Sequence, residues 1–449
     1  MGEVLSPIAL PCGRILQNRL TKVAMYEHGA NALGGPPTPM LWSLYSSWGE
    51  GQWGMLITGN IQVSKTHLTM GCDMVFPTSV TPETVAPFRR LATAMHGASG
   101  NNGSLAIAQI SHTGRQAANF MGGRFPFFPP LAPSATRVGS GASDGIISRI
   151  AYSALFQTAR EMSPPEIEEV IAGFVRGAVV AMEAGFDGVQ LHASHGYLLA
   201  QFISPKTNLR TDEYSEPLCV PRKIVQQIRS IVPREFVVGI KLNAADYVSG
   251  GLTEAQAISH VREIATWAVD FIEISGGDYE SPEFMNKSPG KRQAFFEQFS
   301  RLAVKCLPIG TPQGPSPLIL LTGGLRTRSH FASVLRNRHA HLLGLGRLSV
   351  LHPHLPAELK SNHDPTFLKE PPEEPSPATP EWFPKLVGAS VGVAWYVVAM
   401  RRIADGEEPP VGLGTAGVLL EMYLGKHYLL KVYGFLAVVG ATVAFVLLS

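Results

Sequence analysis

Eight short apolar runs with helical patterns between them constrain the fold of this chain more than any other feature. They are Leu20 to Ala24, Met55 to Thr58, Leu105 to Ile110, Gly188 to His192, Phe236 to Leu242, Phe271 to Ile274, Leu318 to Thr322 and His341 to Leu345. Buried strands that alternate with helices are typical of a parallel sheet. Eight such units favour a closed (β/α)8 TIM barrel over a doubly wound open sheet.

The connecting segments carry helix boundary signals that support this pattern. Ser163 precedes two prolines and Glu166, which is the arrangement of a capped helix start, and Gly185 marks its end. Further helices are expected after Gly250-Gly251 and after Thr327. The sequence therefore predicts an α/β barrel whose crossover helices cover the sheet.

Charge and cysteine content exclude some classes of function. The chain has 37 Lys and Arg against 35 Asp and Glu, a net charge of +2, so no nucleic-acid partner is expected. The cysteines are scattered, without a CxxC pair, and favour a reducing compartment; they are Cys12, Cys72, Cys219 and Cys306.

The domain organisation follows from composition. Residues 1–363 are predicted to form the barrel and residues 364–385 a proline-rich linker, because proline continues neither a helix nor a central strand. Residues 386–449 are predicted to be an apolar, membrane-associated helical tail. Its runs are Leu386 to Met400 and Val432 to Ser449, and the second is near the minimum length that spans a bilayer. We expect a cytosolic barrel anchored to an intracellular membrane; the alternative is a pair of helices buried against the barrel.

Reactive groups in a TIM barrel project from the C-terminal ends of the strands. Polar or bulky side chains lie at or just after the ends of five of the predicted strands: Met25 and Tyr26, Asn60, Gln109, His192 with His195 and Tyr197, and Lys241. The last two strands end instead in LTGGLRT, with Gly323 and Gly324, and in LGLGRLS, with Gly346 and Arg347. Open backbone amides at these positions commonly bind a phosphate, so a phosphorylated ligand is expected across the barrel mouth.

Three interpretations remain open for His192, His195 and Tyr197 from the residues alone. A zinc site lacks a third ligand at a suitable spacing and an HExxH motif, so no metal is predicted. A structural cluster that caps a loop is the second interpretation. The third is proton chemistry, in which the imidazoles donate to a substrate oxygen and the phenol supplies a proton. That chemistry needs a cofactor to carry the electrons.

The run HASHGYLLAQFISPKTNLRTDEY resembles the signature of the old yellow enzyme family of FMN-dependent oxidoreductases. Four more motifs match in order: LQNRLTKVAM, AQISHTGRQ, VVGIKLNAADY, and LTGGLRT with LGLGRLS. The resemblance covers Leu5 to about Pro356, and it is to fungal members with an added apolar tail. It implies a TIM barrel that binds FMN and takes electrons from NADPH or NADH. It also implies a small-molecule enone or enal as the substrate.

The resemblance also implies roles for individual residues. His192 and His195 would bind the carbonyl oxygen of an α,β-unsaturated compound, and Tyr197 would protonate its α-carbon. Gln109 would bond the flavin pyrimidine, and Lys241 would stand at its N1 and O2 edge. The remaining cofactor contacts would come from Ala24, Met25, Tyr26 and Asn60 beside the ring and from Gly323, Gly324, Gly346 and Arg347 at the phosphate.

One departure from the family pattern is Tyr26, which stands where relatives usually carry threonine or cysteine near the flavin C4 oxygen. Two alternatives to an ene-reductase remain. One is a redox-neutral isomerase that uses the same flavin, and the other is an inactive, membrane-tethered barrel that acts as a binding protein.

Overall fold

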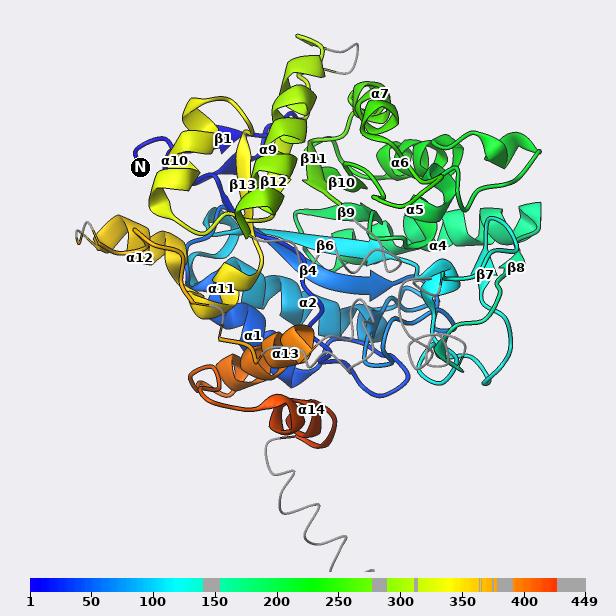
Figure 1. Ribbon diagram of the computed structural model, residues 1–449, viewed down its shortest axis with the longest axis horizontal. Helices are drawn as coiled ribbons and strands as arrows, with labels where there is room; N and C mark the ends of the chain where they lie inside the picture. The colour runs from blue at the N-terminus through cyan, green and yellow to red at the C-terminus, as the bar shows by residue number, and fades with distance from the viewer. Residues whose placement is uncertain are drawn as a thin grey trace, which may run out of the picture.

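The computed structural model describes residues 1–139, 154–276, 289–310, 314–362, 364, 366–373, 375–377 and 391–425. Within them the eight predicted runs form eight parallel strands. These are β3 (Leu20–Lys22), β4 (Met55–Gln62), β6 (Leu105–Ser111), β9 (Gly188–Ala193), β10 (Val237–Asn243), β11 (Phe271–Ser275), β12 (Leu318–Thr322) and β13 (Leu342–Leu345). Each strand pairs with the next along the chain, and β13 pairs with β3. The sheet is closed, which confirms the predicted TIM barrel (Figure 1).

The inside of the barrel is filled by one apolar cluster toward the N-terminal ends of the strands. Its members include Ile57, Ile107, Val237, Phe271 and Leu320, all of which are fully buried. The antiparallel hairpin of β1 (Ile8–Ala9) and β2 (Ile15–Leu16) adds Leu10 and Leu16 to the same cluster. These side chains fill the barrel interior at this end, and the cavity described below lies at the opposite, C-terminal end.

Helices surround the strands, as the alternating pattern predicts. They are α1 (Pro39–Gly49), α2 (Pro82–His96), α4 (Pro164–Glu183), α6 (Cys219–Ile231), α7 (Glu254–Ile264), α9 (Pro289–Cys306), α10 (Arg328–Arg336), α11 (Arg347–Leu351) and α12 (Leu355–Ser361), with the short α5 (Leu198–Ile203) beside β9. The start of α4 is a capping box in which the Ser163 amide donates to Glu166 at 2.9 Å. Thr253 and Thr327 cap α7 and α10 in the predicted positions.

Smaller strands flank the barrel. β5 (Met74–Val75) pairs with the end of β4, and β7 (Leu131–Ala132) pairs with β8 (Arg160–Glu161). β4 and β6 lose register between Ile57 and Asn60. Gly59 lies in this irregular stretch, where a Cβ atom would collide with the Glu27 carboxylate; its amide instead donates to Glu27 at 2.8 Å. The bulge thus ties the end of β4 to the loop after β3.

The predicted linker begins on the barrel surface. The Arg328 amide donates to the carbonyl of Leu368 at 3.1 Å, and the Leu368 side chain is buried. The Phe367 ring meets His352 edge-on at 5.6 Å. Residues 364–373 therefore still pack against the barrel where they are described.

The apolar tail contributes two helices, α13 (Val391–Ala404) and α14 (Thr415–Leu424). The described part of the first apolar run, residues 391–400, lies in α13, where Trp395, Val397 and Val398 are buried. In Figure 1, α13 lies beside α1. Residues 391–400 thus pack against the barrel helices α1 and α11, as the alternative expects of this part of the run. Val432 to Ser449 lie outside the described residues.

The described helices offer no candidate for a membrane span. None of them combines the length and the apolar character that crossing a bilayer requires.

Candidate functional site

A cavity of about 360 Å³ opens at the C-terminal ends of the strands. Eight predicted site residues line it: Ala24, Met25, His195, Lys241, Gly323, Gly324, Gly346 and Arg347. Tyr26, Asn60, Gln109, His192 and Tyr197 do not line it directly. They lie at neighbouring strand ends, and the contacts below connect them with the cavity.

The β12 and β13 side of the cavity is formed largely by backbone. Gly323 has φ +113° and Gly324 has φ +76°, values that side-chain-bearing residues rarely adopt. The chain can turn sharply there, and the Phe296 ring lies next to Gly323, 3.3 Å from where a Cβ atom would stand. Arg347 lies directly after Gly346 and also lines the cavity. This side has the form expected of a phosphate site.

The opposite side is a chain of buried side chains. Gln109 Nε2 donates to Gln190 Oε1 at 2.7 Å, and Gln190 Nε2 donates to Glu273 Oε2 at 2.7 Å. Glu273 Oε1 in turn lies 3.0 Å from Lys241 Nζ and accepts from Thr322 at 2.8 Å. Lys241 therefore presents its charge as part of a buried ion pair.

Sequence reasoning missed Gln190 and Glu273. Each sits in the centre of an otherwise apolar strand, GVQLHA and FIEIS, and this polar interruption was the available signal. In the sheet Gln190 lies opposite Gln109, and Glu273 lies opposite Lys241. The network follows from strand register.

His192 is buried and neutral. Burial, followed by the nearby His195 and Lys241, holds the pKa of its imidazole well below the usual range. His192 Nδ1 lies 3.4 Å from the Ser194 amide nitrogen and 3.2 Å from the Ser194 hydroxyl oxygen, so Ser194 occupies this side of the ring. In the tautomer that carries its proton on Nε2, this neutral imidazole can donate one hydrogen bond from that atom.

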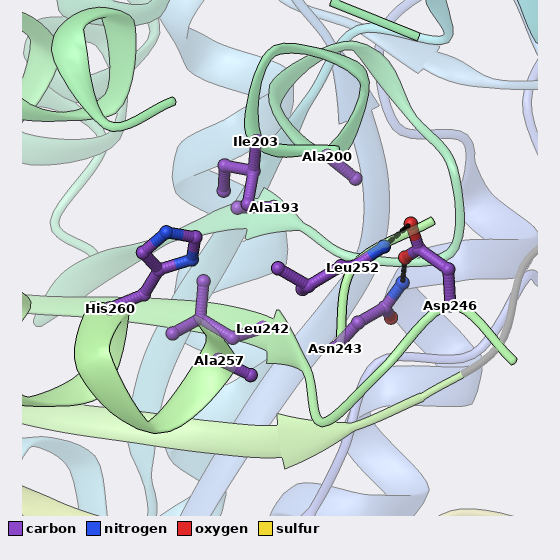
Figure 2. A pocket seen from close by; sticks show the side chains of 9 residues that line it. All are labelled: Ala193, Ala200, Ile203, Leu242, Asn243, Asp246, Leu252, Ala257 and His260. Atoms are coloured by element: carbon purple, nitrogen blue, oxygen red, sulfur yellow. Dashed lines mark hydrogen bonds between the residues drawn. The ribbon is translucent and has the colours of Figure 1, made fainter. Parts of the chain in front are cut away.

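His195 is held in an unusual backbone conformation, with φ +57°. Its amide donates to Asn243 Oδ1 at 3.0 Å, and its Nε2 lies 2.8 Å from the Ser275 hydroxyl oxygen. Asn243 is fixed by Asp246, to which it donates at 3.0 Å (Figure 2). Asp246 also accepts from the Leu252 amide at 2.8 Å. Sequence reasoning missed this supporting role of Asp246.

Tyr197 completes the cluster. It is the N-cap residue of α5, and its ring meets His192 edge-on with centroids 4.6 Å apart. The rings of His192 and His195 also meet edge-on, at 5.3 Å. The three residues of the central motif are thus brought together at the end of β9.

Tyr26 and Asn60 lie at the ends of the first two barrel strands. The Tyr26 hydroxyl donates to Asp73 Oδ2 at 3.2 Å, and burial together with Asp73 raises its pKa well above the usual value. Asn60 lies opposite Gln109 between β4 and β6. Asn60 is therefore on the side of the mouth that carries the polar network, whereas Tyr26 follows β3, between β13 and β4.

Comparison with known proteins settles the family. Residues 3–365 match the model of the NADH:flavin oxidoreductase / NADH oxidase family. The chain is 37% identical to the NADH-dependent flavin oxidoreductase iliE of Neonectria sp. (strain DH2), over 78% of this chain and 46% of that protein. It is 33% identical to the NADH-dependent flavin oxidoreductase iccE of Talaromyces variabilis, over 88% of this chain and 97% of that protein. The chain belongs to this family.

Solved structures agree on the fold of this flavin oxidoreductase. The old yellow enzyme homologue from Zymomonas mobilis superposes with a TM-score of 0.63 at 20% identity, over 80% of this chain and 92% of that chain. Morphinone reductase in complex with tetrahydroNAD gives 0.61 at 20% identity, over 80% and 90%. Together with the family match, they confirm the old yellow enzyme resemblance. FMN is the cofactor, and NADH or NADPH is the electron donor.

The residues of this flavin oxidoreductase fit FMN. Gln109 Oε1 is buried and has no hydrogen-bond partner within the described part of the chain, so it can accept from a ring N–H. The glycines of the opposite side leave space for a phosphate. Arg347 lines the same cavity and supplies a positive charge that suits a phosphate.

Proposed function

We propose that this flavin oxidoreductase reduces the carbon–carbon double bond of an α,β-unsaturated carbonyl compound. The observation that carries the proposal is the cluster of His192, His195 and Tyr197 at the end of β9. It combines a buried neutral imidazole, a second imidazole that lines the cavity and a phenol in one place. Such a cluster suits a carbonyl substrate, because it offers hydrogen-bond donors for the oxygen and a proton for the adjacent carbon.

In this proposal each protein group has one task. His192 donates from Nε2 to the carbonyl oxygen, since Ser194 occupies the Nδ1 side of its ring. His195 assists from the cavity wall, where Asn243 and Ser275 hold it. Tyr197 delivers the proton to the α-carbon. Bound FMN, reduced by NADH or NADPH, supplies the hydride for the β-carbon.

The first test is to identify the cofactor and then follow both reactants. FMN released from the denatured protein would establish loading. An enal or an enone incubated with the loaded protein and NADPH without oxygen should yield the saturated carbonyl, with one NADPH consumed per product. His192→Ala should lose most of this turnover, because the carbonyl oxygen loses a donor.

Two results would replace the proposal. A substrate whose double bond migrates while NADPH remains constant would identify a redox-neutral isomerase. A folded protein that refuses added FMN would identify a binding protein.

Attachment to a membrane through residues 432–449 stays a prediction, as does the cytosolic location of the barrel. Fractionation of cells that express the full-length chain and a version ending at residue 425 tests it. Equal recovery of both in the high-speed supernatant would exclude the predicted anchor.

A further inference from the structure

The helices α13 and α14 lie outside residues 3–365, which match the family. They nevertheless form part of the folded body. α13 packs along α1, and the buried Trp395 side chain donates to the carbonyl of Pro410 at 3.2 Å, which fixes the connection toward α14. Figure 1 shows α13 beside α1, with α14 next to α13 and farther from the barrel. The added helices are thus in a position to influence the site.

Arg401 connects α13 with the barrel mouth. Its Nη2 donates to the carbonyl of His28 at 3.0 Å. Its Nη1 donates to the carbonyls of Met422 at 2.5 Å and Glu421 at 3.4 Å in α14. Because the planar guanidinium holds its donors in a fixed geometry, one side chain links the loop after β3 to both added helices.

His28 is the point in the barrel that receives this link. It is a buried non-glycine residue with φ +51°, a conformation that persists only when the surroundings enforce it. Its ring meets Tyr26 edge-on at 5.6 Å on one side and Tyr423 of α14 edge-on at 6.1 Å on the other. Arg401 and Tyr423 therefore supply part of what holds His28.

Tyr26 is two residues before His28 and follows the cavity-lining residues Ala24 and Met25. Its hydroxyl is held by Asp73, which also accepts from the amides of residues 69–71 at 3.1 to 3.2 Å. The barrel thus holds the hydroxyl group of Tyr26 through Asp73. Arg401 holds the backbone two residues later, at the His28 carbonyl.

We propose that α13 and α14 brace the active site and that Arg401 is a positioning residue for Tyr26. It acts through the His28 carbonyl and sets where the Tyr26 ring stands beside the flavin. The inference rests on the proposed function in one respect, namely that Tyr26 adjoins FMN. By this inference α13 and α14 influence the surroundings of the bound flavin and the access of the substrate to the site.

The test uses the full-length protein and two adjacent arginines. Arg401→Met removes the donors to His28 and keeps an apolar side chain of similar length. Arg402→Met is the matched control, because Arg402 forms its ion pair with Glu421 at 2.9 Å inside the added helices. Arg401→Lys keeps the charge and some donors, and it provides the comparison if the methionine variant does not fold.

Amide hydrogen exchange of the FMN-free protein is the first readout. The reporter is the amide of Ala30, which donates to the carbonyl of Cys72 at 3.2 Å. Arg401→Met should speed exchange in residues 26–31 about tenfold, whereas Arg402→Met should leave it unchanged. Arg401→Lys should lie between wild type and the methionine variant.

The visible spectrum of the FMN-loaded protein is the second readout. Arg401→Met should shift the flavin bands and raise KM for an enone at least threefold, and neither change should appear when Tyr26→Ala, which removes the ring, is already present. Exchange rates and spectra equal to wild type would overturn the inference, as would equal changes in Arg401→Met and Arg402→Met. A faster exchange with an unchanged flavin spectrum would also overturn it.

Failure of the proposed function gives a different pattern. In that case the loaded wild-type protein reduces no enone. The changes in hydrogen exchange and in the flavin spectrum caused by Arg401→Met remain, and they still support the positioning role of Arg401.

Discussion

The two sides of the barrel mouth differ in composition, since one is rich in glycine and the other in buried polar side chains. At β12 and β13 the wall is glycine backbone with positive φ at Gly323 and Gly324. At β6, β9, β10 and β11 it is a chain of buried side chains from Gln109 to Lys241. The contacts on the side-chain side depend on strand register, because they join residues that lie opposite each other in neighbouring strands. In the proposed function the first side would hold the phosphate of the cofactor, and the second would carry the chemistry.

The largest expected effect lies on the side-chain side. Tyr197→Phe should slow the reduction of an enone about 10²- to 10⁴-fold, the usual contribution of a general acid. Reduction of the cofactor by NADPH needs no proton from this phenol and should keep its rate. Rapid-mixing measurements of the two half-reactions separate these steps. An unchanged enone rate would remove Tyr197 from the proposed chemistry.

The folded protein should lose stability in acid because of a buried histidine at the end of β6. His112 at the end of β6 is buried, and burial together with Arg124 lowers the pKa of its imidazole to about 3. Below pH 6.5 the unfolded chain therefore binds a proton that the folded chain does not, so stability is lost as pH falls. At pH 4.5 this costs the folded state about 2 to 3 kcal/mol.

Urea unfolding between pH 7.5 and 4.5 tests whether the free energy of unfolding decreases as the pH falls. His112→Asn should flatten the dependence, while exposed His354→Asn serves as the control. A variant that loses stability with acid as steeply as wild type would contradict the assignment to His112.

On the backbone side, Gly323→Ala should weaken FMN binding by about tenfold. A side chain at φ +113° strains the backbone by about 1 to 2 kcal/mol, and cofactor binding must restore that conformation. Titration of the FMN-free protein measures the dissociation constant. Gly412→Ala is the control, because Gly412 also has positive φ but lies outside the barrel with open space around it. Equal affinity in wild type and Gly323→Ala would place the phosphate elsewhere.

An effect of about the same free energy concerns charge. Glu273→Gln removes the negative partner of Lys241 and should raise the flavin midpoint potential by about 30 mV, which is ~1.4 kcal/mol for a two-electron couple. The sign is positive because reduced flavin gains negative charge beside an ammonium that is no longer neutralised. Glu297→Gln, which alters a carboxylate bonded to His330 and His339 outside the barrel mouth, should leave the potential unchanged.

The same contrast explains what could be predicted from the sequence. The strands, the capped helices and the glycine turns depend on neighbouring residues, so short patterns predict them. The Gln109–Gln190–Glu273 contacts join residues more than 80 positions apart and depend on strand register. The apolar run in α13 was harder to interpret, because a helix buried against a barrel and a membrane helix share the same composition.

The closure of the barrel has a consequence for synthesis of the chain. β3 pairs with β13 through Leu20 and Leu343, so the first strand of the barrel gains this partner only after the last strand has been made. Until then β3 and β12 are open sheet edges that can associate with other chains. Newly made chains should therefore be most exposed to aggregation, and most dependent on chaperones, just before translation passes residue 345.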